Sequence, residues 1–125
     1  MTVDWRKLTR DAGLMVRGEA IELRLAGGRK HVVHVDDRSG GQLRLWSVVA
    51  KAGLVREVSQ ANIRAWTRNR VTELVGFKLE QSGRLVGEAW VPLAGLTHAE
   101  WEFYVRSVAL ACDRFEYVLT GQDVE

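Results

Sequence analysis

The sequence predicts an α+β fold in which an antiparallel sheet of about five strands packs against helices, in the order αβββαββα. Three observations indicate this fold. Apolar and polar residues alternate over several short segments, glycine-rich or polar turns join these segments, and a long C-terminal segment repeats its apolar residues every three or four positions. Because the chain has 125 residues, of which 46% are hydrophobic, we expect a single domain over residues 1–125.

The N-terminal part predicts a short helix followed by a meander of strands. Thr2 is the expected N-cap of the helix, Trp5 lies on its apolar side, and Gly13 is expected to end it. The apolar period then changes to two, which is typical of strands, and Gly27-Gly28 supplies a hairpin turn. The strands expected in this part are residues 20–25, 29–36 and 42–50.

A second short helix is expected to follow Ser59, which is a good N-cap residue. The helical period places Ile63 and Trp66 toward the core. Arg64 and Arg68 are four residues apart, so they share a helix face, which we expect to point to solvent.

The C-terminal half predicts a second hairpin and a long final helix. Residues 71–80 and 84–91 have strand-like alternation, and the turn residues 81–83 lie between them. Thr97 and Glu100 form a capping box, in which each side chain accepts a hydrogen bond from a free backbone N–H. The helix is expected to continue for about six turns, until Gly121. Its apolar stripe consists of Trp101, Tyr104, Val105, Val108, Cys112, Phe115 and Leu119.

The charge, the apolar runs and the cysteine content indicate the class of ligand and the cellular location of the protein. Its formal net charge of +2 is too small to indicate nucleic-acid binding by itself. The sequence has neither the apolar run of a signal peptide nor the roughly 18 apolar residues that span a bilayer. A single cysteine, Cys112, has no partner for an internal disulfide, which fits a reducing compartment. We therefore expect a cytoplasmic protein that does not associate with membranes.

The residue types that usually act in catalysis do not form a recognisable active-site pattern in this sequence. His31 and His34 are three apart on an expected strand, so their side chains point to opposite faces and are poorly placed to share a metal ion. Cys112 lies on the apolar stripe of the final helix, which predicts a buried, unreactive thiol. The sequence also lacks a catalytic-triad pattern, a phosphate-binding glycine loop and paired carboxylates. We expect no catalytic residue, no metal and no cofactor.

A group of arginines supports an alternative function, the binding of nucleic acid through phosphate contacts. The group consists of Arg56, Arg64, Arg68 and Arg70. Glu57 lies among them, and no motif of a known nucleic-acid-binding fold is present. A solvent-facing or partner-facing arginine surface is therefore the favoured interpretation, with a small basic nucleic-acid-binding domain as the alternative.

Two of the five tryptophans are expected on the second face of the sheet. Trp46 and Trp90 alternate with the apolar residues that define the core face of their strands, so both rings point away from that core. An apolar second face on an antiparallel sheet is usually covered. A helix of the same chain, a second copy and a bound partner are all consistent with the pattern.

Several short motifs occupy the turns, strands and helix core of the C-terminal half. They are Asn69-Arg70, Gly76-Phe77, Ser82-Gly83-Arg84-Leu85, Pro92-Leu93 and Cys112-Asp113-Arg114-Phe115-Glu116. Together with the order of elements, they resemble the type III secretion chaperone-like superfamily, and its YbjN-like branch in particular, over about residues 60–123. The resemblance implies a homodimeric α+β domain that holds a protein partner. Secretion chaperones of this shape tend to be acidic, and this slightly basic chain departs from that pattern.

These observations predict a non-enzymatic module, chaperone-like or an adaptor, that binds a protein or peptide and forms a homodimer. The residues expected at the dimer interface or in the partner groove are Trp46, Trp66, Trp90, Arg64 and Arg68. Aromatic side chains are enriched in such contacts because they carry a large apolar area with few rotatable bonds.

Overall fold

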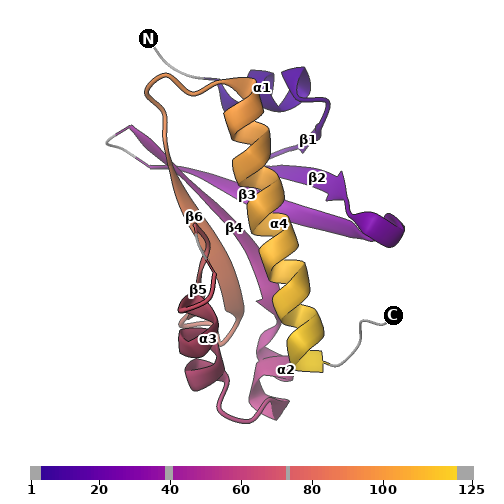
Figure 1. Cartoon of the computed structure of the whole chain (residues 1–125), viewed down its shortest axis with the longest axis vertical. Coiled ribbons are helices and arrows are strands. Elements are labelled where there is room, and N and C mark those ends of the chain that lie inside the picture. Colours follow the sequence, from indigo (N-terminus) through magenta and orange to yellow (C-terminus); the bar gives the residue numbers. More distant parts are fainter. Residues whose placement is uncertain (1–3, 39–40, 73, 121–125) are drawn as a thin grey trace.

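The computed structural model describes residues 4–38, 41–72 and 74–120. A six-stranded antiparallel sheet has the strand order β1-β2-β3-β4-β6-β5, and helix α4 lies across one of its faces (Figure 1). The strands are β1 (Met15–Arg17), β2 (Ala20–Arg24), β3 (Lys30–Arg38), β4 (Gln42–Ala50), β5 (Gly76–Leu79) and β6 (Leu85–Pro92). The helices are α1 (Trp5–Asp11), α2 (Ala52–Glu57), α3 (Ala61–Asn69) and α4 (His98–Thr120). The predicted α+β fold with an antiparallel sheet is confirmed.

The core lies between α4 and the sheet. The predicted apolar stripe of α4 is confirmed, because its central residues are buried against β3, β4 and β6. Trp101 has no exposed surface, and its indole Nε1 donates to the Thr9 hydroxyl at 2.8 Å. That hydroxyl in turn donates to the carbonyl of Trp5 at 2.6 Å. Helix α1 is therefore fixed to α4 by a buried hydrogen-bond chain beside two packed indole rings.

A glycine in β6 permits close contact between the sheet and α4. A Cβ atom built on Gly87 would lie 2.5 Å from the Cys112 sulfur and 2.9 Å from the ring of Phe77. The space that a side chain would fill is occupied by these two groups, so a larger residue would overpack the core. The burial predicted for Cys112 is confirmed.

The ends of the outer helices follow the expected capping chemistry in part. At α4, the backbone N–H of Glu100 donates to the Thr97 hydroxyl at 3.2 Å, and the N–H of Thr97 donates to the Glu100 carboxylate at 3.0 Å, which confirms the capping box. At α1, Asp4 is the N-cap, since its carboxylate accepts from the N–H of Arg6 at 3.0 Å. The expected N-cap Thr2 and the expected helix end Gly121 lie outside the described residues.

Three elements differ from the expected pattern. Strand β1 and helix α2 were not expected, because three and six residues are too few to show a period in the sequence. The strand expected over 71–80 is limited to β5, since the chain before it turns at Leu74, whose φ is 73°. A backbone in that left-handed region does not continue a strand.

The expected orientation of the second helix is wrong. Ala61 and Ala65 are the buried residues of α3, whereas Ile63 and Trp66 are 51% and 61% exposed. Ser59 is not the N-cap, because the helix begins after Gln60, which is in the left-handed region at a φ of 56°. The small side chains of the two alanines let α3 lie close to its neighbours, whereas the larger Ile63 and Trp66 point outward.

Candidate partner-binding surfaces

The face of the sheet opposite α4, here called the uncovered face, has no helix of the described residues packed on it (Figure 1). Its central residues are His34, Asp36, Arg44, Trp46, Glu88 and Trp90, which the strand register brings together as cross-strand neighbours. The structure thus places Trp46 and Trp90 on the second face, as their alternation in the sequence predicted. Trp90 is 45% exposed and is the more accessible of the two rings.

An ionic network holds the centre of the uncovered face rigid. Arg44 is only 6% exposed and contacts the carboxylates of Glu88 at 2.5 Å and Asp36 at 3.2 Å. The carboxylate of Glu80, at 3.6 Å, is its third partner. Three carboxylates around one buried guanidinium fix its position.

The ring of Trp46 packs against the side chains of this network. It stacks on His34 with the ring centroids 4.2 Å apart, and the guanidinium groups of Arg44 and Arg84 lie 5.4 and 5.1 Å from its centroid. The pKa of His34 is lowered by burial and by the nearby Arg84. Trp46 is therefore held in place as part of the uncovered face, and Trp90 is the aromatic side chain of that face that a partner can reach.

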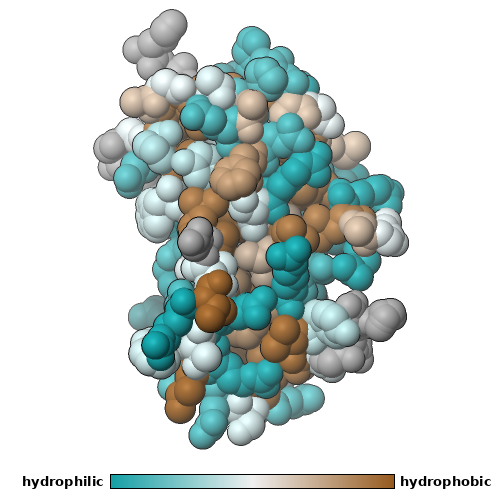
Figure 2. Space-filling view, in the orientation of Figure 1, coloured by the Kyte–Doolittle hydropathy of each residue, from teal (hydrophilic) through white to brown (hydrophobic). Residues whose placement is uncertain are grey.

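Helix α3 presents a separate apolar surface, here called the α3 patch, which consists of Ile63, Trp66 and Arg70. These residues follow one another at spacings of three and four, so they share a helix side. The Arg70 guanidinium lies 5.2 Å from the centroid of the Trp66 ring. Figure 2 shows brown apolar surface among the teal in the lower half of the molecule. Trp66 is thus not on the same surface as Trp46 and Trp90.

The predicted interface arginines lie on the inner side of α3. Arg64 donates to the carbonyl of Val118 at 3.2 Å, and the Arg68 guanidinium lies 5.7 Å from the centroid of the Phe115 ring. Both contacts are with α4. The two arginines therefore fasten α3 to α4 instead of pointing to solvent.

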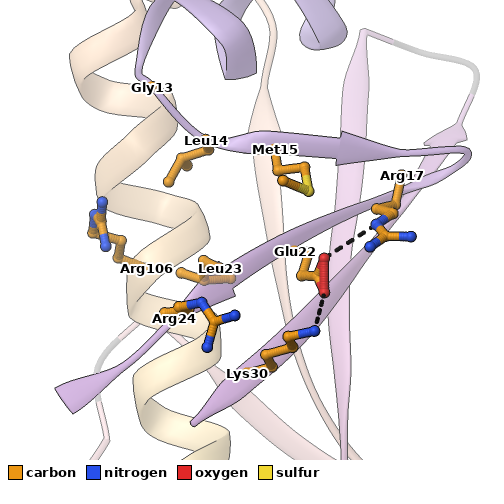
Figure 3. Close-up of a pocket in the computed structure, with 9 residues that line it drawn as sticks. All are labelled: Gly13, Leu14, Met15, Arg17, Glu22, Leu23, Arg24, Lys30 and Arg106. Atoms are coloured by element: carbon orange, nitrogen blue, oxygen red, sulfur yellow. Dashed lines mark hydrogen bonds and ion pairs between the residues drawn. The ribbon is translucent and has the colours of Figure 1, made fainter. Parts of the chain in front are cut away.

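A third feature is a hollow of about 480 Å³ at the β2 edge of the sheet (Figure 3). Strand β1 pairs with β2 only from Ala20 to Glu22, and the chain before it turns away at Gly13 toward α1. The hollow occupies the place that a longer β1 would fill. It is lined by Gly13, Leu14, Met15, Arg17, Glu22, Leu23, Arg24, Lys30 and Arg106. Sequence reasoning missed it, because Arg106 is distant along the chain from the other residues.

Structural comparison places this architecture among solved proteins. The chain is similar to a chain of the HopA1–SchA chaperone–effector complex, with a TM-score of 0.59 and 12% identity over 92% of this chain and 98% of that one. It is also similar to the type III secretion chaperone SycH from Yersinia pestis, solved with a fragment of YscM2, with a TM-score of 0.58 and 8% identity over 93% and 96% of the two chains. The fold is that of the type III secretion chaperones.

The predicted resemblance is confirmed for both of its branches. YbjN from E. coli matches the chaperone fold of this chain with a TM-score of 0.57 and 13% identity, over 86% of this chain and 84% of YbjN. No family model matches the sequence, and the search of curated proteins found no match to it. Among the described residues, no helix combines the length and apolar character needed to cross a membrane.

The one thiol in this chaperone fold is not placed for nucleophilic chemistry. Burial raises the pKa of Cys112 to about 12, so the group stays protonated at neutral pH. The thiolate is the reactive form of cysteine. Cys112 therefore serves in packing.

His31 belongs to a charged contact between β3 and α4. Its Nε2 lies 3.6 Å from Asp113, and the ligand atoms of His31, Asp113 and Glu116 lie within 4.8 Å of one another. Three such groups are a possible ligand set for a divalent cation. However, Arg29 already pairs with Asp113 at 2.6 Å, so the geometry favours an ion-paired link between strand and helix. His34 lies on the opposite face of the sheet, as predicted.

We expect the free energy of unfolding to fall as the pH drops below about 6.5, the ordinary pKa of histidine. Burial lowers the pKa of His31 in the folded chain, although Asp113 partly offsets this. The unfolded state therefore binds protons more readily over this range and gains stability as the pH falls. Urea unfolding at several pH values tests this expectation. His31→Gln should flatten the profile, and the exposed His98→Gln is the matched control; equal slopes in all three proteins would contradict it.

Proposed function

We propose that this chain is a non-enzymatic, cytoplasmic protein-binding module that holds an extended segment of a protein partner on its uncovered face. The observation that carries the proposal is an open sheet face with an accessible Trp90 beside a rigid network around Arg44. A preorganised surface loses little conformational entropy when a partner binds. The likeness to SchA and SycH, both solved in complexes with protein partners, supports this interpretation.

We further propose that the protein forms a homodimer through the α3 patch. Trp66 and Ile63 are both more than half exposed, although large apolar side chains gain free energy when buried. Arg64 and Arg68 hold α3 against α4, so the patch is presented on a fixed helix. A two-fold pairing would bring each patch against its own copy.

The positions of three of the four arginines, Arg64, Arg68 and Arg70, argue against the alternative of nucleic-acid binding. Arg64 and Arg68 are engaged with α4, and Arg70 lies over Trp66. Phosphate binding needs guanidinium groups that are free to reach a nucleic-acid backbone. A protein partner is therefore the better-supported ligand.

Capture of a partner from native cell extract, identified by mass spectrometry, tests the proposed function. Trp90→Ala should lower the captured amount roughly tenfold, because central aromatic residues dominate protein interfaces. Phe103→Ala removes another exposed ring, on α4, and is the matched control. Equal capture by the wild-type chain and the Trp90 variant would show that the uncovered face is not the binding surface.

A further inference from the structure

A second hollow lies between α3 and the C-terminal half of α4 (Figure 1). Helix α3 packs on β5, whereas α4 packs on β3, β4 and β6. The long side chains of Arg64 and Arg68 span the space between the two helices and leave a cavity of about 230 Å³, here called the α3–α4 hollow. It is lined by Arg64, Thr67, Arg68, Val71, Phe115 and Val118.

The α3–α4 hollow contains two positive charges and no negative one. Arg64 donates to the carbonyl of Val118, which carries no charge. The Arg68 guanidinium lies 5.7 Å from the centroid of the Phe115 ring, and its buried Nε has no hydrogen-bond acceptor among the described residues. Neither arginine has a carboxylate partner in the part of the chain that the structure describes. Because both side chains are half-buried and lose part of their hydration, an anion beside them would be stabilised.

The rest of the wall of the α3–α4 hollow is largely apolar. Val71 and Val118 are 74% and 51% exposed, and the ring of Phe115 is buried beside them. An apolar group in the hollow would remove these side chains from water, which a ligand that carried only charge would not do. A volume of about 230 Å³ equals that of roughly eight water molecules in the liquid, so the hollow fits a ligand of about eight non-hydrogen atoms.

The neighbouring hollow does not offer the same chemistry. It has a volume of about 570 Å³ and shares Arg64, but it is also lined by the carboxylates of Glu57 and Glu116. These two negative charges outnumber the one cation and would repel an anion. A nucleic-acid backbone also fits the α3–α4 hollow poorly, because it needs several cations that reach successive phosphates. The two unpaired arginines therefore suit a small anion.

We propose that the α3–α4 hollow binds a small organic acid that has one carboxylate and an apolar tail of roughly five carbons. The carboxylate pairs with the guanidinium groups of Arg64 and Arg68, whose N–H groups match the two oxygens of a carboxylate. The tail packs on Phe115 and Val118. This site lies outside both the uncovered face and the α3 patch, so the inference does not depend on the proposed function.

Nitrogen-15 NMR of the full-length chain tests this inference through the Nε–H signal of Arg68, which is assigned by its loss in Arg68→Gln. The ligands are hexanoate, the neutral hexanamide, the cation hexylammonium, and acetate, which keeps the charge but lacks the tail. Hexanoate should shift the signal and bind at least about tenfold more tightly than each of the others, because only hexanoate offers both a carboxylate and an apolar tail. Equal binding of hexanamide, or of acetate, would overturn the inference.

Val118→Glu should weaken hexanoate binding by roughly tenfold, because it adds a negative charge to the wall of the hollow. Val118 is 51% exposed, so the substitution leaves the core intact. Leu110→Glu places the same charge on α4 at a position that is 39% exposed and outside the hollow, and should leave the affinity unchanged. Unchanged affinity in Val118→Glu, an equal loss in Leu110→Glu, or an equal shift of the Arg68 signal by inorganic phosphate would contradict the inference.

Discussion

Trp101→Ala is expected to destabilise the fold by about 3–5 kcal/mol, the usual cost of deleting a fully buried aromatic side chain. Trp101 has no exposed surface and lies where α1, α4 and the sheet meet. The variant also leaves the Thr9 hydroxyl without the indole donor, which adds to the cavity cost. Because small domains have a total stability of about 5–15 kcal/mol, a large part of the stability would be lost.

Urea unfolding followed by circular dichroism measures this effect. Thr9→Val removes the hydrogen bond but little volume, and should cost only about 1–2 kcal/mol. Trp66→Ala truncates an indole that is 61% exposed, and should change the free energy of unfolding by no more than about 0.5 kcal/mol at a concentration where the chain is monomeric. Similar losses for Trp101→Ala and Trp66→Ala would show that the core is assigned to the wrong residues.

Local patterns explain why some elements were predicted well. The strand expected over residues 42–50 coincides with β4, because its alternation runs without interruption. The final helix was predicted from a capping box and a repeat of apolar residues, both of which depend only on near neighbours in sequence. Such elements are specified by their own residues.

Tertiary packing explains the errors at α3. The helical period of the sequence predicted that the largest apolar residues, Ile63 and Trp66, face the core. The structure instead buries Ala61 and Ala65. Arg64 and Arg68, which also lie on α3, reach across to α4. Arginine can occupy such positions because its aliphatic stem packs on apolar surface while its charged head finds a polar or aromatic partner.

The candidate site was predicted in part. Alternation placed Trp46 and Trp90 on the second face, but it could not show that Trp66 lies on a different surface. The hollow at the β2 edge was missed because it depends on where β1 stops and on Arg106, which α4 brings across the fold. Register and helix placement are long-range properties, and no motif in the sequence encodes them.

Trp66→Glu is expected to convert a homodimer into a monomer without unfolding the chain. A carboxylate in the centre of a two-fold apolar contact must be desolvated beside its own copy, so the dimer dissociation constant should rise by roughly a hundredfold or more. Trp66 is 61% exposed within one chain, and the substitution therefore leaves the core intact. Light scattering at micromolar concentration should give twice 14.1 kDa for the wild-type chain and about 14.1 kDa for the variant.

Trp90→Glu places the same charge on the uncovered face and is the matched control, because that surface is proposed for the partner and not for the second copy. It should leave the dimer mass unchanged. If Trp90→Glu were monomeric and Trp66→Glu dimeric, the dimer interface would have to lie on the uncovered face of the sheet and not on the α3 patch. A wild-type mass near 14.1 kDa across the whole concentration range would remove the homodimer from the proposed function, and the exposed apolar side chains of the α3 patch would then be available to the protein partner instead.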